Sequence, residues 1–136
     1  MTPNMLVDLA KEAMKASYSP YSHFTVGAAL LCQNGNVYTG CNIENASYTP
    51  TICAERTAFF KAISQGERNF VAIAIVGGAN QTVTVACPPC GVCRQVMAEF
   101  CDKDHFMVYL GTADGYESYT LHELLPHGFY PSQLKA

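Results

Sequence analysis

FVAIAIVGG, residues 70–78, is an unbroken apolar run rich in valine and isoleucine. Such a run, without polar residues in alternation, is typical of a strand that is buried on both faces. HFMVYLGT, residues 105–112, predicts a second buried strand. Because strands of this kind need helices on both sides of their sheet, the two runs favour an α/β fold.

A helix and a hairpin are expected before these strands. Residues 2–17 carry apolar side chains at helical spacing, and Thr2 is a candidate N-cap. Residues 24–33 and 37–43 predict two strands, and the Asn-Gly dipeptide between them strongly favours a two-residue hairpin turn. The hairpin would add two strands to the sheet.

Two more helices are expected on either side of the 70–78 strand along the chain. One covers residues 53–65 and stops at Gly66, and the other covers residues 90–101, with Pro89 suited to open it. Hairpin, helix, strand, helix, strand is an order rich in βαβ units, so we expect a mixed sheet with helices on both faces. An edge strand at 115–120 and a short last helix at 121–125 are expected to complete a single domain over residues 1–136.

The composition is that of an ordinary globular protein. Of the 136 residues 49% are hydrophobic and 14% charged, and the formal net charge is −3. The chain has no block of five or six basic residues, which argues against a nucleic-acid polymer as partner. It also has no apolar run near the roughly 20 residues that span a bilayer and no signal-peptide pattern at its start. We therefore expect a cytoplasmic protein without membrane contact.

The seven cysteines point to metal or catalytic chemistry rather than to disulfides, because a cytoplasmic compartment is reducing. Cys90 and Cys93 share one face at the start of an expected helix. The pair is compatible with a thioredoxin-type redox site, although the prolines here precede the cysteines. A structural zinc site would need a second pair, whereas a catalytic zinc site needs three protein ligands and leaves one position open. Cys53, at the start of another helix, is the natural third ligand.

The charged residues beside these cysteines suit a catalytic zinc ion. Three thiolates give Zn²⁺ a formal charge of −1, and Arg56 and Arg94 could withdraw charge by donating hydrogen bonds to sulfur. If Cys53 caps its helix, Glu55 in the first turn can reach the open coordination position, where a carboxylate is suited to move protons. Each residue alone has an ordinary structural explanation, and the combination carries the hypothesis.

With these motifs the sequence resembles the small, single-domain cytidine deaminases with an all-cysteine zinc site. The segments that carry the resemblance cover nearly the whole chain: YSPYSHFTVGAALL, GCNIENASY, CAERTA, PCGVCRQV and ELLPHGF. The resemblance implies a three-layer cytidine-deaminase-like α/β fold around a mixed five-stranded sheet. It also implies one Zn²⁺ per chain held by Cys53, Cys90 and Cys93, with Glu55 as the proton shuttle.

The resemblance extends to the substrate. It implies that Asn42 and Glu44 hold the ribose hydroxyls, and side chains two positions apart on an extended strand do face the same side. It implies that Phe24 packs on the pyrimidine and that the backbone of Ala54 contacts the base edge. The residues implied to line a neighbouring subunit's pocket in a homotetramer are Ala46, Tyr48 and Phe129.

The implied reaction is the zinc-dependent hydrolytic deamination of cytidine and 2′-deoxycytidine to the uridines, with release of ammonia, as in pyrimidine salvage. A deaminase of an antibiotic such as blasticidin S would share the zinc core, but Asn42, Glu44 and Phe24 favour an unmodified ribose. A polynucleotide-editing deaminase would need a basic groove. A non-enzymatic zinc module would need four ligands and would have no use for Glu55.

Cys87 departs from the family pattern, as an additional thiol close to the expected ligands. The two prolines between Cys87 and Cys90 favour an extended backbone. We therefore expect the two sulfurs to point apart and Cys87 to be a bystander rather than a fourth ligand.

Overall fold

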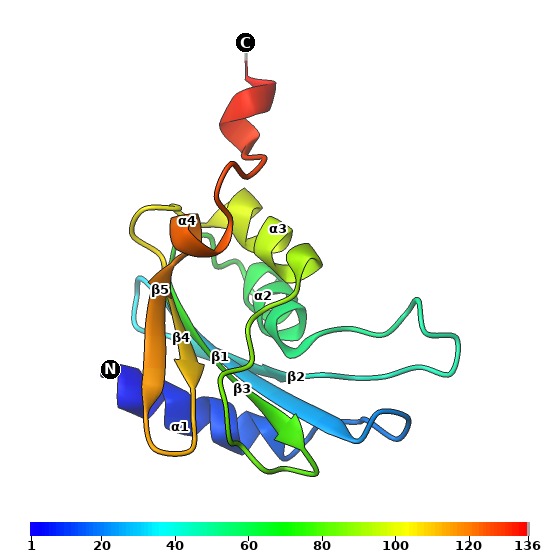
Figure 1. The fold of residues 1–136 in the computed structure, drawn as a ribbon. Coiled ribbons are helices and arrows are strands. Elements are labelled where there is room, and N and C mark those ends of the chain that lie inside the picture. The colour runs from blue at the N-terminus through cyan, green and yellow to red at the C-terminus, as the bar shows by residue number, and fades with distance from the viewer. Residues whose placement is uncertain (136) are drawn as a thin grey trace.

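The computed structural model describes residues 1–135, which form one sheet with helices on both faces (Figure 1). The helices are α1 (Pro3–Met14), α2 (Ala54–Ser64), α3 (Gly91–Phe100), α4 (Leu121–Leu124) and the 3₁₀ helix η1 (Pro131–Leu134). The strands are β1 (Phe24–Cys32), β2 (Val37–Cys41), β3 (Phe70–Ala79), β4 (Met107–Gly111) and β5 (Tyr116–Thr120).

The sheet has five strands in the order β2-β1-β3-β4-β5. β1 pairs antiparallel with β2 and β3, β3 pairs parallel with β4, and β4 pairs antiparallel with β5. The expected mixed five-stranded sheet is therefore confirmed. β3, the strand predicted to be buried on both faces, lies at the centre, and its residues 72–78 are all buried.

Alternate residues of β3 serve two separate cores, because successive side chains of a strand point to opposite faces. Ala72, Ala74 and Val76 pack against α1. Ile73 and Ile75 pack in the cluster that contains four buried apolar residues of α2 and Met97 of α3. The three layers are thus α1, the sheet, and the pair α2 and α3, which lie together above the sheet in Figure 1.

A glycine on β2 allows the start of α2 to approach the sheet. A Cβ atom on Gly40 would lie 2.5 Å from the carbonyl oxygen of Ala54 and 2.6 Å from the amide nitrogen of Ala58. Any larger residue would therefore push the first turn of α2 away. This contact sets the position of the residues that begin α2.

Several expected boundaries differ from the structure. The helix expected over 2–17 ends at Met14, and the next three amides bond to carbonyls three residues back in a tighter turn. The hairpin loop holds three residues, because the amide of Cys32 bonds to the carbonyl of Asn36 and Gly35 has a φ of 92°. Pro89 precedes the N-cap of α3 instead of opening the helix.

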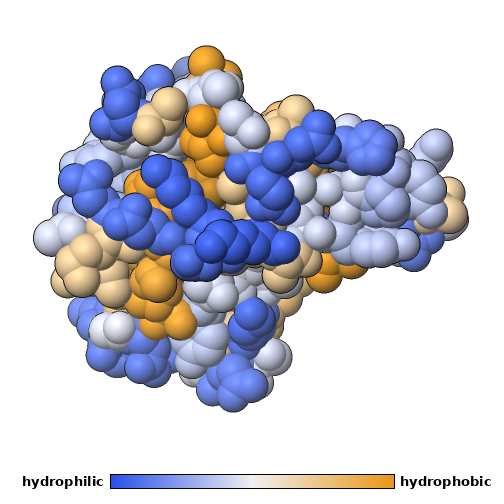
Figure 2. Space-filling view, turned by 90° about the horizontal axis from the view of Figure 1, so that it is seen from below, coloured by the Kyte–Doolittle hydropathy of each residue, from blue (hydrophilic) through white to orange (hydrophobic). Residues whose placement is uncertain are grey.

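Two segments extend from the body of the chain. The loop between β2 and α2 projects to the right in Figure 1, and the molecule narrows to an arm on the same side of Figure 2. Residues 126–135, which include η1, rise away from the sheet beyond α4. Within residues 1–135, every helix is too short or too polar to cross a membrane.

Candidate metal centre and active site

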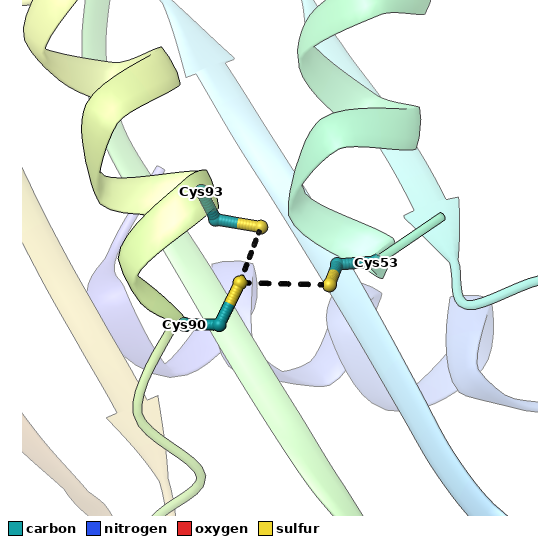
Figure 3. A group of neighbouring side chains, drawn as sticks. All are labelled: Cys53, Cys90 and Cys93. Atoms are coloured by element: carbon teal, nitrogen blue, oxygen red, sulfur yellow. Dashed lines mark hydrogen bonds between the residues drawn. The ribbon is translucent and has the colours of Figure 1, made fainter. Parts of the chain in front are cut away.

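Three cysteine sulfurs converge where α2 and α3 begin (Figure 3). The Sγ atoms of Cys53 and Cys90 are 3.7 Å apart, and those of Cys90 and Cys93 are 3.6 Å apart. All three sulfurs lie within 4.8 Å of one another. Cys53 and Cys90 are the N-cap residues of the two helices, and Cys93 follows in the first turn of α3.

This donor set fits a zinc ion. Tetrahedral zinc with Zn–S bonds of about 2.3 Å requires sulfurs about 3.8 Å apart, close to the observed separations. The side chains of Cys53 and Cys90 form no capping hydrogen bond, so both sulfurs remain available as ligands. The positive ends of two helix dipoles favour the thiolate form there. Three sulfur ligands leave one coordination position for a water molecule, as in catalytic rather than structural zinc sites.

Arg56 donates a hydrogen bond from Nη2 to the Sγ of Cys53 at 3.3 Å. The pKa of the Cys53 thiol is lowered to about 5, most strongly by the hydrogen bond from Cys93 and then by the one from Arg56. The arginine side chain thus supplies the positive charge that a cluster of thiolates needs.

Arg94 does not share this role, contrary to the expectation from its place after Cys93. Its Nε donates to the carbonyl oxygen of Pro89 at 2.7 Å, and its Nη1 donates to the carbonyl oxygen of Leu124. The guanidinium therefore ties the backbone before Cys90 to the end of α4. Because both nitrogens donate to backbone carbonyl groups, Arg94 stabilises the segment before Cys90 instead of bonding to sulfur.

Glu55 lies in the first turn of α2 and is only 4% exposed. Burial raises the pKa of its carboxyl group to about 7, and the nearby charge of Cys53 adds to this effect. A carboxyl group with this pKa is present in both protonation states near neutral pH, which suits a group that takes and returns protons.

Glu55 and two cysteines of the sulfur cluster, Cys53 and Cys90, line a small cavity of about 180 Å³. One wall comes from the backbone leading into α2, and the other comes from the segment before α3. The lining residues are Val26, Asn42, Thr51, Ile52, Cys53, Ala54, Glu55, Cys87, Pro88 and Cys90. The cavity therefore joins a metal-binding cluster, a buried acid and the polar side chain of Asn42.

Asn42 is held firmly at the cavity by β1. Its Nδ2 donates to the carbonyl oxygen of Phe24 at 2.8 Å, and its Oδ1 accepts from the amide of Val26 at 2.9 Å. The hydroxyl of Ser17 also donates to this Oδ1. The strands thus orient the amide before any ligand is present.

Glu44 lies outside the small cavity, in an adjoining hollow of about 410 Å³ that Tyr21 and Tyr48 also line. Its carboxylate accepts hydrogen bonds from the amides of Tyr21 and Ser22 at 3.0 and 3.1 Å and from the Ser22 hydroxyl. The hydrogen bond from the Ser22 side chain is the main reason that the carboxyl pKa is lowered. Sequence reasoning did not identify Ser22, whose role depends on the meeting of two loops.

Four other expected substrate residues do not line the small cavity within residues 1–135. Phe24 lies at the start of β1 and is 42% exposed. Ala46 is exposed, Tyr48 is 74% exposed and Phe129 is 54% exposed. A single chain therefore leaves these side chains open to solvent.

Cys87 is outside the group of three sulfurs that could hold a metal ion, as expected. Burial raises the pKa of its thiol to about 11, so it stays protonated near neutral pH. It nevertheless lines the cavity, which the extended Pro-Pro segment did not suggest. Its position follows from the path of the chain between β3 and α3, which spacing alone does not reveal.

Comparison with known proteins gives a consistent result. Residues 2–109 match the family model described as "Cytidine and deoxycytidylate deaminase zinc-binding region". The chain is 53% identical over 130 residues to a cytidine deaminase of Halalkalibacterium halodurans, with 95% of each protein covered. It is 48% identical over 135 residues to a cytidine deaminase of Sporosarcina psychrophila, covering 98% of this chain and 96% of the relative.

Solved structures of cytidine deaminases also match this chain. The crystal structure of cytidine deaminase from Burkholderia pseudomallei matches with a TM-score of 0.86 and 44% identity, over 95% of this chain and 100% of that one. Cytidine deaminase from Mycobacterium tuberculosis matches with a TM-score of 0.79 and 38% identity, over 95% of this chain and 98% of that one.

Proposed function

The chain belongs to the cytidine and deoxycytidylate deaminase family, and we propose that it is a zinc-dependent hydrolase that deaminates cytidine and 2′-deoxycytidine. The products are uridine, 2′-deoxyuridine and ammonia, so the enzyme would act in pyrimidine salvage. The observation that carries this proposal is the cluster of Cys53, Cys90 and Cys93 beside the buried Glu55 at one cavity.

In this proposal the three cysteines bind the metal and Glu55 transfers protons. A zinc ion held by the three sulfurs would activate a water molecule for attack on C4 of the cytosine ring. Glu55 takes a proton from the attacking water and passes protons to N3 and then to the leaving amine. Its burial keeps the carboxyl pKa near 7, so it can both accept and return a proton during one turnover.

Four further residues bind the nucleoside in this proposal. Asn42 and Glu44 hold the ribose hydroxyls, and free acceptor capacity on the Glu44 carboxylate supports the assignment. The backbone of Ala54, which lines the cavity next to Glu55, contacts the base edge. Phe24 packs on the pyrimidine from the side of β1.

The active enzyme is a homotetramer in this proposal, with Ala46, Tyr48 and Phe129 completing the pockets of neighbouring subunits. Two observations support it. The loop that carries Tyr48 and the tail that carries Phe129 both extend from the body of the chain (Figure 1). Tyr48 is 74% exposed and Phe129 54% exposed in the single chain, and contact with a neighbouring subunit would bury both rings.

A cytoplasmic location completes the proposal, and the seven free cysteines support it. The test of function is the release of ammonia from cytidine, cytosine, CMP and blasticidin S by the purified zinc-loaded protein. Turnover of cytidine but not of blasticidin S supports the proposal. Turnover of blasticidin S alone would favour the antibiotic deaminase instead.

A further inference from the structure

The cavity beside the metal cluster has two chemically different walls. Cys53, Ala54 and Glu55 form the wall at the start of α2, and Cys87, Pro88 and Cys90 form the wall before α3. Figure 3 shows Cys53 and Cys90 reaching the sulfur cluster from opposite sides. A flat ring that lies edge-on between these walls turns one edge toward each of them.

The proposed function determines which edge faces which wall, and the inference depends on that function. C4 of the ring has to lie at the sulfur cluster, and N1, which carries the ribose, is at the opposite corner of the ring. N3 has to face Glu55 to receive its proton. The remaining edge, formed by C5 and C6, then faces the wall of Cys87 and Pro88.

This second wall is closely packed. The Sγ of Cys87 lies against Gly77 of β3, where an added Cβ atom would be 2.8 Å from that sulfur. The same Cβ would be 3.2 Å from Cε2 of Phe24, so the thiol and the aromatic ring share the surface of this glycine. The proline at position 88 restricts the backbone that carries the thiol. The sulfur therefore has little freedom to withdraw toward the sheet.

We propose that Cys87 is a specificity-determining residue that limits the size of the substituent on C5 of the cytosine ring. Cys87 lines the cavity at the wall that faces C5 in this arrangement, and the close contact of its Sγ with Gly77 limits its movement toward the sheet. Removal of the sulfur opens a space the size of a methyl group, whereas a longer apolar side chain closes the space that remains. Neither change touches the sulfurs that hold the metal or the carboxyl group that moves protons.

The experiment measures kcat/KM for 5-methylcytidine and for cytidine with the zinc-loaded enzyme and reports their ratio. Cys87→Ala should raise the ratio about tenfold, and Cys87→Leu should lower it by a similar factor, because one methyl group changes discrimination in an apolar pocket by about 10–200-fold. Cys87→Ser keeps the size of the side chain and should leave the ratio within about twofold of wild type. The matched control is Cys41→Ala, a half-buried thiol on β2 outside the cavity, which should not change the ratio.

Cys87→Ala and Cys87→Leu are expected to change the ratio in opposite directions, so either one tests the proposal if the other fails to fold. Zinc content and circular dichroism identify a variant that has not folded. If cytidine is turned over and the folded Cys87 variants keep the wild-type ratio, the inference is wrong while the proposed function stands. A change as large in Cys87→Ser as in Cys87→Ala would also overturn it, since size would then not be the cause. If the wild-type enzyme releases no ammonia from cytidine, the proposed function fails first.

Discussion

The guanidinium of Arg56 lies 3.3 Å from the Sγ of Cys53, the N-cap residue of α2. Arg56 follows this cysteine by three residues, in the first turn of the helix. A positive charge at this distance stabilises a thiolate and draws electron density away from the metal it binds. The arrangement resolves a conflict in the site, because three thiolates alone would make a bound water less acidic.

Arg56→Ala should therefore slow deamination and raise the pH at which activity appears. Without the arginine, the sulfurs donate more charge to the metal and the pKa of the water that reacts rises. The expected loss at neutral pH is about ten- to a hundredfold, since a charge-assisted hydrogen bond contributes about 1.5–3 kcal/mol. The pH–rate profile and the zinc content measure the two effects separately.

Arg94→Ala is the informative comparison for this variant. Its guanidinium bonds to the carbonyls of Pro89 and Leu124 and to no sulfur, so its loss should lower thermal stability without moving the pH–rate profile. An unchanged profile for Arg56→Ala, or the same shift in both variants, would contradict the assigned role of Arg56.

Metal binding should depend on three cysteines and not on a fourth. Cys53→Ser, Cys90→Ser and Cys93→Ser should each lose most of their zinc, because the donor set is then incomplete. Cys87→Ser should keep one zinc per chain, since its sulfur is outside the cluster. Metal analysis of the purified variants is the measurement. Loss of metal from Cys87→Ser with retention in Cys53→Ser would show that the ligand set is wrong.

Glu55→Gln should keep zinc and fold but lose turnover by about 10²–10⁴-fold, the usual contribution of general acid–base catalysis. Glutamine keeps the size of the buried side chain and removes the group that accepts protons. Glu99→Gln, on the exposed side of α3, is the control and should keep wild-type activity. Retention of more than about a tenth of the activity in Glu55→Gln would be incompatible with a proton shuttle at this position.

Subunit mixing tests whether Phe129 serves a neighbouring pocket. Phe129→Ala and Glu55→Gln chains should each be weakly active, whereas a re-assembled mixture should regain activity, because some pockets then combine an intact Glu55 with an intact Phe129. Ammonia release before and after mixing is the measurement, with sedimentation to establish the tetramer. A monomeric protein would refute the prediction. So would a lack of rescue when subunit exchange has been demonstrated and the Phe129→Ala parent is inactive.

Glu67 should stabilise the β1–β2 hairpin in a pH-dependent way. Its carboxylate accepts hydrogen bonds from the side chains of Asn34, Asn36 and Tyr38. The bonds from the two asparagines lower its pKa below the ordinary value of 4.5, with the Asn36 bond the largest cause. A carboxyl group whose folded pKa is lowered contributes stability above its unfolded pKa and loses it as the pH falls through the folded pKa.

Glu67→Ala should therefore melt at a lower temperature than wild type at pH 7, and the difference should shrink below pH of about 4. Thermal unfolding of both proteins across this range is the measurement. Glu117→Ala, at an exposed position on β5, provides the control for the loss of one negative charge. A melting difference that stays constant down to low pH would show that the carboxylate charge is not responsible.

Local sequence patterns were sufficient to predict the main helices and strands of this fold. The apolar run at 70–78 predicted a strand buried on both faces, and that strand is the centre of the sheet. Cysteines expected at two helix starts are the N-caps of α2 and α3. The errors concern termini and turns, such as the early end of α1 at Met14 and the three-residue hairpin loop. Neighbouring groups, rather than the pattern of the segment itself, decide where such boundaries fall.

The sequence alone determined which chemical groups are available: three cysteines in two motifs, a carboxyl group after the first, and arginines after both. Only the tertiary structure decided how they meet. Arg56 and Arg94 have equivalent places in their motifs, yet Arg56 bonds to sulfur and Arg94 braces backbone carbonyls, because α3, which carries Arg94, packs against α4. Cys87 became part of the cavity wall in the same way, through the packing of its segment against Gly77 of β3. Spacing along a chain determines which side chains share one element, whereas contacts between elements depend on how their surfaces pack.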